Sequence, residues 1–420
     1  MRILLWHGYL LGGTGSNVYT RALARAWKRA GHEVVVLCQE AHPEQYDLGG
    51  AEVVRPEIGG LLPVFVLDRY EGVEARLLQD FKPAERGRYV ELNAAALRER
   101  LPADAVFTNH VLLGGPVGAA AGAPFAVKAH GSELEYSMRG RPELQRWGAE
   151  ALEQAAATFV GSAHIRAVLE EVVGHVDRVY EVPPGVDVDD WVPRRRDEAL
   201  VALLEQARRD PPNPGNANER HADADNAERL AAFFAVERPT VVFFGKLIRN
   251  KGVQVLLEAL AGLDASAVVV GFGDYRADLE AAAPPGTLFT GPLEHRHLIH
   301  LLPLADVAVV PSIFPEAFGM VAAEAAASGT PPLVARHSGL REVAAGIEEE
   351  YPPEFAHLVA FEPGNADDLR RKLAQLLHLP AETRRGLGLS ARRAVERRWS
   401  WTRIAERLLE PLAGSGPPDR

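Results

Sequence analysis

The sequence predicts an α/β protein of two doubly wound domains in tandem, each a parallel sheet covered by helices on both faces. Short β-branched runs alternate with helical stretches in the first half of the chain, the alternation stops between residues 194 and 238, and it then restarts. The length of 420 residues suits two or three domains, at roughly 150 residues each. We expect the domains to face each other across a cleft, with ligands at the carboxyl ends of the strands.

The first domain is expected over residues 1–185. Residues 17–30 have the periodicity of a helix, and Gly31 suits its C-terminal cap. Short apolar and β-branched runs predict the strands of the sheet. These runs are residues 3–6, 34–37, 105–108, 125–128, 158–160 and 178–181.

The second domain is expected over residues 186–398. Residues 210–225 are rich in turn-forming residues, and we interpret them as a mobile insertion, with an ordinary solvated loop as the alternative. The regular pattern then resumes. Strands are expected at residues 241–244, 267–270, 287–290, 307–310, 332–335 and 358–361, and helices at 253–261, 294–301, 321–328 and 366–378.

Residues 399–420 are expected to form a helix that packs back on the first domain. Ser400 suits the N-cap, and apolar residues recur at helical spacing after it. An interfacial membrane helix is the alternative for this segment. The apolar face consists of Trp401, Ile404, Ala405, Leu408 and Leu409.

Composition excludes several classes of protein. Hydrophobic residues make up 47% of the chain and charged residues 25%, which excludes disorder as the main state. The single cysteine, Cys38, excludes a disulfide framework and a cysteine-based zinc site. A net charge of −11 argues against broad binding of duplex nucleic acid. With no signal peptide or spanning segment recognised, we expect a cytoplasmic protein and leave peripheral membrane attachment and oligomeric state open.

Two loops predict phosphate binding. The first contains Gly12 and Gly13 between the first strand and its helix, where a glycine backbone can approach an anion and the helix start offers free N–H groups. It matches neither a dinucleotide fingerprint nor a Walker loop, and a tight structural turn is the alternative. The second places Lys246 and Lys251 just after the first strand of the second half, where two cations suit a diphosphate. Solvated surface lysines are the alternative there.

Residues 311–329 contain the strongest motif. Two prolines follow a predicted strand, Glu316 precedes a helix, and Glu324 lies inside that helix among alanines. A carboxylate buried without a partner is costly, so Glu324 calls for a ligand such as a vicinal diol.

This motif resembles family-four retaining glycosyltransferases of the GT-B architecture, whose two domains are Rossmann-like. The string from Pro315 through Glu324 resembles the family's Glu-x7-Glu signature, and Gly245-Lys246 with Lys251-Gly252 resembles its diphosphate-binding pair. The family more often has arginine at the position of Lys246, and lysine lacks the bidentate fork. The segments at residues 183–187 and 399–401 resemble the family's two crossings between domains.

The resemblance implies a role for each matching residue. Glu324 would bind the ribose, Glu316 the transferred sugar, and Lys246 with Lys251 the departing diphosphate. His130 would lie beside the sugar and the acceptor, with His7 a weaker candidate. Neither a metal ion nor a cofactor is implied, since the lysines would replace a divalent cation. The other donor-binding residues would be Gly12, Gly13, Leu293, Phe318, Gly319, Met320 and Val321.

The reaction implied is transfer of a hexose-type sugar from a UDP-, GDP- or ADP-sugar to a hydroxyl acceptor. A nucleotide-sugar epimerase of the same architecture, an NAD-dependent oxidoreductase and a non-catalytic carbohydrate-binding protein are the alternatives. His295 and His297 lie in an expected helix near the nucleotide base and do not suggest a metal site. The acceptor stays open among a sugar phosphate, a small polyol and a lipid-linked compound. Candidate phosphate contacts, with solvated surface charge as the alternative, are Arg69, Arg76, Arg86 and Arg88.

Overall fold

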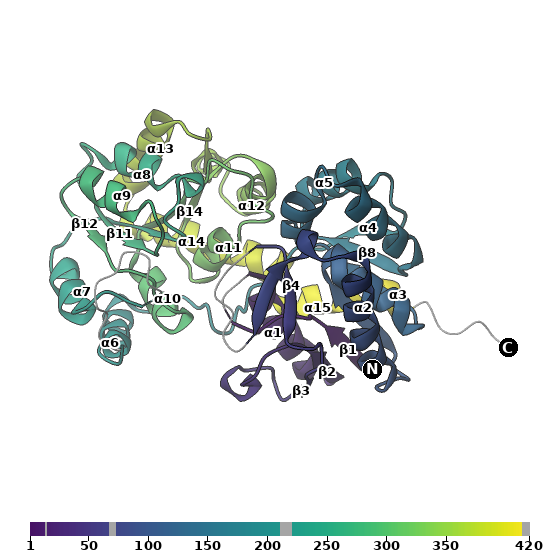
Figure 1. The fold of residues 1–420 in the computed structure, drawn as a ribbon. Coiled ribbons are helices and arrows are strands. Elements are labelled where there is room, and N and C mark those ends of the chain that lie inside the picture. The colour runs from purple at the N-terminus through teal and green to yellow at the C-terminus, as the bar shows by residue number, and fades with distance from the viewer. Residues whose placement is uncertain (13–14, 67–72, 211–220, 414–420) are drawn as a thin grey trace. The chain divides into compact units, whose positions relative to one another are not determined.

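The computed structural model describes residues 1–12, 15–66, 73–210 and 221–413. The chain divides into two compact units. The first contains residues 1–185 together with the segment from residue 401 onward, and the second contains residues 186–400. Each unit is built on its own sheet (Figure 1).

The sheet of the first unit has seven parallel strands in the order β3-β2-β1-β6-β7-β8-β9. The central strands are buried along their whole length, as is usual for a parallel sheet covered on both faces. A separate parallel pair joins β4 (Leu61–Val64) and β5 (Glu74–Leu77). The seven strands are β1 (Arg2–Trp6), β2 (Glu33–Leu37), β3 (Glu52–Val54), β6 (Ala105–Asn109), β7 (Phe125–Lys128), β8 (Ala157–Val160) and β9 (Val179–Glu181).

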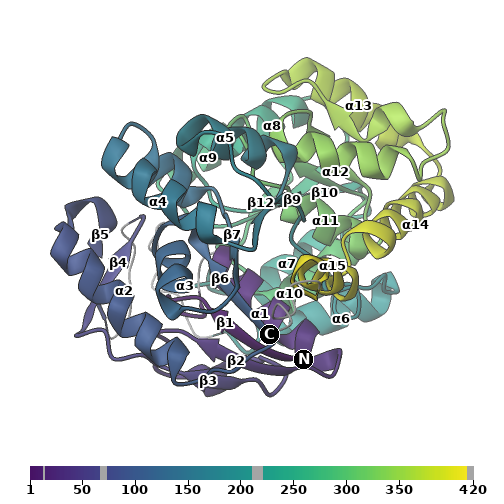
Figure 2. The same ribbon diagram turned by 90° about the vertical axis from the view of Figure 1, so that its right-hand side faces the viewer.

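Two sets of helices cover this sheet. Helices α1 (Gly15–Arg29) and α15 (Trp401–Ala413) share one core with the sheet, and the Trp27 indole donates a hydrogen bond to the Ala405 carbonyl at 3.0 Å. The other core is covered by the helices that follow β5, β6, β7 and β8, several of which are visible in Figure 2. They are α2 (Pro83–Arg98), α3 (Gly115–Ala121), α4 (Pro142–Gln154) and α5 (Ala163–Val173).

The second unit has a six-stranded parallel sheet in the order β12-β11-β10-β13-β14-β15 and one continuous core. Its strands are β10 (Thr240–Phe244), β11 (Ser266–Val270), β12 (Thr287–Phe289), β13 (Val307–Val310), β14 (Pro332–Ala335) and β15 (Ala360–Phe361). Its helices are α6 (Arg196–Ala207), α7 (Asn226–Phe234), α8 (Val253–Leu260), α9 (Arg276–Ala282), α10 (His295–Leu301), α11 (Met320–Ala327), α12 (Ser338–Glu348), α13 (Ala366–His378) and α14 (Ala381–Arg398).

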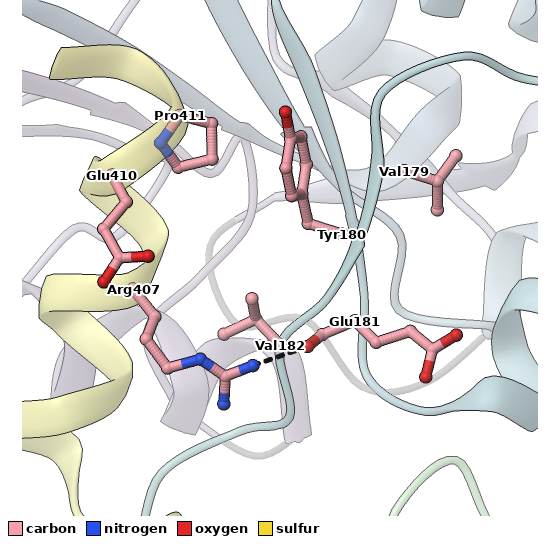
Figure 3. Close-up of a pocket in the computed structure, with 7 residues that line it drawn as sticks. All are labelled: Val179, Tyr180, Glu181, Val182, Arg407, Glu410 and Pro411. Carbon is pink, nitrogen blue, oxygen red and sulfur yellow. Dashed lines mark hydrogen bonds between the residues drawn. The ribbon is translucent and has the colours of Figure 1, made fainter. Parts of the chain in front are cut away.

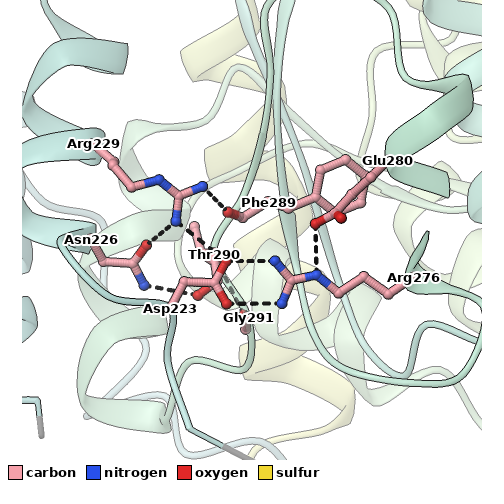
Figure 4. Close-up of polar contacts among 8 residues, drawn as sticks. All are labelled: Asp223, Asn226, Arg229, Arg276, Glu280, Phe289, Thr290 and Gly291. Atoms are coloured by element: carbon pink, nitrogen blue, oxygen red, sulfur yellow. Dashed lines mark hydrogen bonds and ion pairs between the residues drawn. The ribbon is translucent and has the colours of Figure 1, made fainter. Parts of the chain in front are cut away.

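The structure describes only the two ends of the segment 210–225, and it shows side chains there in ion pairs; the mobile insertion stays a prediction. Asp223 forms a two-pronged ion pair with Arg276, with distances of 2.8 and 2.6 Å, and also contacts Arg229 at 3.3 Å (Figure 4). Asp210 likewise bonds Arg296 and His297 on α10. The charges that suggested a solvated loop are therefore paired, while residues 211–220 lie outside the described residues.

The chain passes between the units at two adjoining places. The Val186 N–H donates to the Trp399 carbonyl at 2.6 Å, so these crossings are joined within the second unit. Trp399 and Ser400 belong to that unit, two residues beyond the boundary expected from the sequence. The apolar face predicted for the last helix is buried in the first unit, as expected for a packed helix. Among the described residues, no helix is long and apolar enough to span a membrane.

Lys128, the last residue of β7, is buried, and its ammonium group donates to the Val182 carbonyl at 2.5 Å. Burial, aided by the charge of Arg407 and opposed by Glu133, lowers the pKa of Lys128 from 10.5 to about 7. Between these values the unfolded chain binds more protons than the folded one, so stability rises with pH.

We expect the urea midpoint of the wild-type protein to increase from pH 7 to pH 10 relative to that of Lys128→Met, because the buried amine then costs less to keep neutral. Comparison with the variant cancels the contributions of the other titrating groups. Lys246→Met, at an exposed position, is the control and should follow the wild type. Parallel pH profiles for the wild type and Lys128→Met would contradict the prediction.

Candidate active site

Two loops meet at the carboxyl ends of β10 and β13, which are adjacent parallel strands. The Ile313 and Phe314 N–H groups both donate to the Asn250 carbonyl, at 3.0 and 3.3 Å. Gly252 has a φ of +71°, and a Cβ there would lie 1.9 Å from the Pro311 carbonyl oxygen. Glycine is therefore required for the loops to approach this closely.

This junction brings two of the predicted residues into direct contact. The Lys251 ammonium lies 2.5 Å from a Glu316 carboxylate oxygen, which also accepts a hydrogen bond from the Ser312 hydroxyl at 2.5 Å. The side chains of Lys251 and Glu316 are 31% and 22% exposed, so solvent reaches both. Without a ligand, each charge is thus neutralised by the other.

The backbone of Glu316 is held by the start of α12, which follows β14. The Glu316 N–H donates to the Ser338 hydroxyl oxygen at 2.8 Å, and the Ser338 hydroxyl lies 3.0 Å from His337 Nδ1. His337 Nε2 donates to the Ser312 carbonyl at 2.6 Å, since a carbonyl can only accept. His337 and Ser338 therefore connect the segments on either side of the Glu316 carboxylate.

Three other groups are predicted to bind the sugar nucleotide here: the backbone amides of Phe318 and Gly319 and the ammonium group of Lys246. The N–H groups of Phe318 and Gly319, just before α11, have no hydrogen-bond partner in the described part of the chain. Phe318 offers only its backbone, because its ring is buried against Trp399 at a centroid distance of 5.6 Å. Lys246 is exposed, and the structure does not bring it to Glu316; it has no ion pair among the described residues.

Glu324 lies inside α11, among alanines that are fully buried. Across residues 1–12, 15–66, 73–210 and 221–413, no group donates a hydrogen bond to its carboxylate. Burial raises the pKa of Glu324 from 4.5 to about 8. The carboxyl group is thus poised to gain a hydrogen-bonding partner.

The remaining residues predicted to bind the donor are Leu293, Met320 and Val321, and the structure gives none of them a side-chain contact to Lys251 or Glu316. Leu293 is buried in the loop before α10, while Met320 and Val321 open α11. The predicted helix with His295 and His297 is present. His297 is buried and bonds Asp210 at 3.1 Å, which gives it a structural role.

In the first unit, a chain of hydrogen bonds fixes the orientation of His130, which follows β7. The Thr20 hydroxyl donates to the Ser16 carbonyl at 2.8 Å, so its oxygen accepts from Asn109 Nδ2 at 3.2 Å. Asn109 Oδ1 then faces His130 Nε2 at 2.7 Å, and Nε2 must carry the proton. Burial, with the charges of His110, Lys128 and His7, lowers the pKa of His130 well below its usual value, so the ring is neutral.

Beside His130 lies a buried ion pair that the motif analysis did not single out. His110 Nδ1 is 3.2 Å from Glu133 Oε2, and the Glu133 Oε1 atom accepts from the His130 and Val111 amides at 2.9 and 3.3 Å. Burial acts to raise the pKa of Glu133, but the charge of His110 and these hydrogen bonds keep it below its usual value. The rings of His110 and His130 are 4.7 Å apart.

His7 and Gly12 are held around the start of α1. The Gly12 carbonyl accepts from Asn17 Nδ2, which turns Asn17 Oδ1 toward His7 Nε2 at 2.8 Å. Burial, together with the charge of His110, lowers the pKa of His7 to about 3, against the effect of its hydrogen bonds. His7 is therefore a neutral, buried group. Gly13 lies outside the described residues, so its predicted role remains a prediction.

Two of the arginines proposed as phosphate contacts are already paired. Arg86 is buried, bonds Glu143 and stacks over Trp147, which makes it a structural residue and corrects that expectation. Arg76 lies 2.8 Å from Glu85 and over the Phe81 ring. Arg88 is exposed. Arg69 falls outside the described residues.

A cavity of about 500 Å³ lies elsewhere in the first unit, between β9 and α15 (Figure 3). None of the predicted donor-site residues lines it. Arg407 donates to the Glu181 carbonyl at 2.9 Å across this cavity. Its lining residues are Val179, Tyr180, Glu181, Val182, Arg407, Glu410 and Pro411.

Sequence reasoning missed the residues that hold the predicted ones in place. Each lies at the end of a strand or in the loop or helix start that follows one, so the rule that ligands bind at the carboxyl ends of parallel strands could have found them. They are Ser312, His337 and Ser338 in the second unit and Asn109, His110 and Glu133 in the first.

Two family models together cover most of the chain. The model described as Glycosyltransferase Family 4 matches residues 13–190. The model described as Glycosyl transferases group 1 matches residues 225–394.

Named relatives agree with these models. The chain is 30% identical to the 2-deoxystreptamine glucosyltransferase of Streptomyces kanamyceticus over 68% of this chain and 71% of that protein. It is 29% identical to the D-inositol 3-phosphate glycosyltransferase of Xylanimonas cellulosilytica over 95% of this chain and 91% of that protein.

Solved structures show the same fold. A glycosyltransferase from Rickettsia africae superimposes with a TM-score of 0.71 at 17% identity, covering 99% of both chains. The Anabaena protein HepE in complex with UDP and glucose gives 0.68 at 16% identity, covering 98% of this chain and 99% of that one. With its two parallel-sheet units, the chain is a member of the family-four, group 1 glycosyltransferases and has the GT-B fold.

Proposed function

We propose that this glycosyltransferase moves a hexose-type sugar from a nucleoside-diphosphate sugar to a hydroxyl group, with retention of configuration and without a metal ion. The observation that carries the proposal is the polar group at the ends of β10 and β13. It includes the Lys251–Glu316 pair and the amides of Phe318 and Gly319, and α11 adds Glu324; these amides and the Glu324 carboxylate have no hydrogen-bond partner in the described part of the chain. Cations, amides and carboxylates match a diphosphate, an oxyanion and sugar hydroxyls, respectively.

The ion pair of Lys251 with Glu316 gives the site a way to respond to the donor. A diphosphate competes for the ammonium group, and the released Glu316 carboxylate can then accept hydrogen bonds from hydroxyls of the transferred sugar. As the sugar departs, charge grows on the diphosphate oxygens. Lys251, Lys246 and the amides stabilise that charge more in the transition state than in the ground state.

Glu324 suits the ribose of the donor. A vicinal diol supplies two hydrogen-bond donors to one carboxylate, and such bonds favour its ionised form. Binding a ribose would therefore reverse the effect of burial on this group.

Retention and the acceptor rest on the family and its named members. In retaining transfer, the leaving group departs from the face that the acceptor attacks, so the diphosphate can accept the acceptor's proton. The relatives' names include D-inositol 3-phosphate and 2-deoxystreptamine. We therefore infer an acceptor hydroxyl on a polyhydroxylated ring.

The first test concerns the cation. Lys251→Ala should lower kcat about 100-fold or more, because an aimed charge at a developing oxyanion typically contributes about 3–4 kcal/mol. Arg195→Ala, which removes an exposed cation of the same unit, should leave kcat nearly unchanged. The measurement is release of nucleoside diphosphate in the presence of acceptor. Equal rates for Lys251→Ala and the wild type would contradict the proposed role.

The second test uses pH. Since the free carboxyl of Glu324 has a pKa of about 8 and the bound form is ionised, donor binding releases a proton below that pH. Affinity for UDP or GDP, measured by calorimetry, should rise about tenfold from pH 7 to pH 9. Glu324→Gln should flatten this rise. A flat wild-type profile would refute the assignment to the ribose.

The third test concerns the metal. Within the described ranges, no group of three or more His, Cys, Asp or Glu side chains is arranged to hold an ion, and the two lysines carry the charge that a divalent cation would supply. Turnover should therefore persist in EDTA. Loss of activity in EDTA with recovery on adding magnesium would overturn this part of the proposal.

The same assays distinguish a glycosyltransferase from the alternative, a nucleotide-sugar epimerase. An epimerase interconverts the sugar nucleotide without a net transfer to the acceptor. A glycosyltransferase instead yields a glycoside of the acceptor, whose anomeric configuration is read by NMR and should match that of the donor.

A further inference from the structure

The His110–Glu133 pair in the first unit is costly for a structural role. His110 is 2% exposed and Glu133 is completely buried, so both ionisable groups have been removed from water. His110 also adopts a φ of +72°, which is strained for a residue with a bulky side chain. A positive φ, uncommon outside glycine, and two buried ionisable groups at the carboxyl end of β6 suggest a function.

The hydrogen bonds determine which ring nitrogen of His110 is available. Glu133 Oε2 can only accept, so His110 Nδ1 carries the proton that the two atoms share at 3.2 Å. In the neutral ring, Nε2 then has a lone pair. This atom is buried and has no hydrogen-bond partner among residues 1–12, 15–66, 73–210 and 221–413.

The neighbouring His130 presents the same chemistry. Its Nε2 donates to Asn109, so its Nδ1 also has a lone pair. The two rings are 4.7 Å apart, and in their neutral forms each offers one acceptor nitrogen that is not used in these hydrogen bonds. Phe65 and Tyr9 pack against His110 at ring-centroid distances of 5.0 and 5.3 Å, so a ligand reaching Nε2 would displace these rings.

We propose that His110, positioned by Glu133, contacts the acceptor substrate and accepts a hydrogen bond from one of its hydroxyl groups. The inference rests on the proposed function and narrows it. A phosphate dianion has no proton to give and would face lone pairs here, whereas a hydroxyl satisfies them. Any phosphate on the acceptor must then be bound by other residues.

The first experiment reads the ring directly, on the full chain with ¹⁵N-labelled histidine at pH 8. Two-bond ¹H–¹⁵N correlation spectra should show His110 protonated on Nδ1 alone. Added myo-inositol should shift the Nε2 resonance, and inorganic phosphate at the same concentration should not. A doubly protonated His110, a shift with phosphate alone, or no response to myo-inositol would overturn the proposal.

The variant Glu133→Gln tests whether Glu133 determines which nitrogen of His110 is protonated. The amides of His130 and Val111 keep the glutamine oxygen in the place of Oε1, so its NH₂ group faces His110 Nδ1. The amide then donates, and the proton of His110 moves to Nε2. The spectrum should show the reversed tautomer, and an unchanged tautomer would contradict the positioning of His110 by Glu133.

The second experiment measures the KM for myo-inositol with the sugar nucleotide that gives the fastest turnover. His110→Asn tolerates the left-handed backbone and can still donate to Glu133, but it lacks Nε2. It and Glu133→Gln should each raise that KM about three- to tenfold, the loss expected for one hydrogen bond. Donor KM should not change. His42→Asn, at an exposed position of the same unit, is the control.

Unchanged KM values for myo-inositol in both variants would overturn the proposal. If His110→Asn does not fold, Glu133→Gln and the wild-type titration decide the question. Failure of the proposed function would look different, because the wild-type protein would then release no nucleotide from any sugar nucleotide, while the tautomer and the response to myo-inositol could still be read.

Discussion

The second unit depends on the close approach of the two loops that follow β10 and β13. A Cβ on Gly252 would lie 1.9 Å from the Pro311 oxygen, and the Asn250 carbonyl binds two amides of the facing loop. Because this contact is between backbones, it specifies the position of Lys251 opposite Glu316 more firmly than two flexible side chains could by themselves. The charge pair is a consequence of the loop junction and not its cause.

The two units differ in how far their acid–base pairs are exposed to solvent. In the second unit Lys251 and Glu316 stay partly exposed, where an ion pair costs little to separate. In the first unit His110 and Glu133 are buried, and removing either partner would leave the other uncompensated. The first arrangement suits exchange of partners with an anionic ligand, and the second suits a fixed orientation.

Much of the fold follows from local pattern. The expected strand at residues 125–128 is β7, and the helix expected at 366–378 is α13, because continuous apolar runs and amphipathic periodicity are sufficient there. The segment at 210–225 could not be read in this way. Its charges look solvated until tertiary structure brings Arg276 to Asp223 and α10 to Asp210, contacts made across 53 and 86 residues.

The site was predictable to a similar extent. Local motifs are sufficient to single out Glu316, Glu324 and the lysines as candidates. The sequence could not reveal that Lys251 is bonded to Glu316, or that His337 and Ser338 support that glutamate from the start of α12, just after the next strand. These contacts depend on the order of strands in the sheet. The same limit applies to Arg86, whose pairing with Glu143 joins α2 to α4 across 57 residues of sequence.

Helix α15 has a consequence for the way the protein is made. Its apolar residues complete the core shared by α1 and one face of the first sheet. In the sequence, however, the whole second unit lies between α1 and α15. During synthesis from the N-terminus, the first 185 residues leave the ribosome with the surface around Trp27 still open to water. The first unit is therefore the last to be completed, and until then a nascent chain exposes apolar surface that a chaperone can bind.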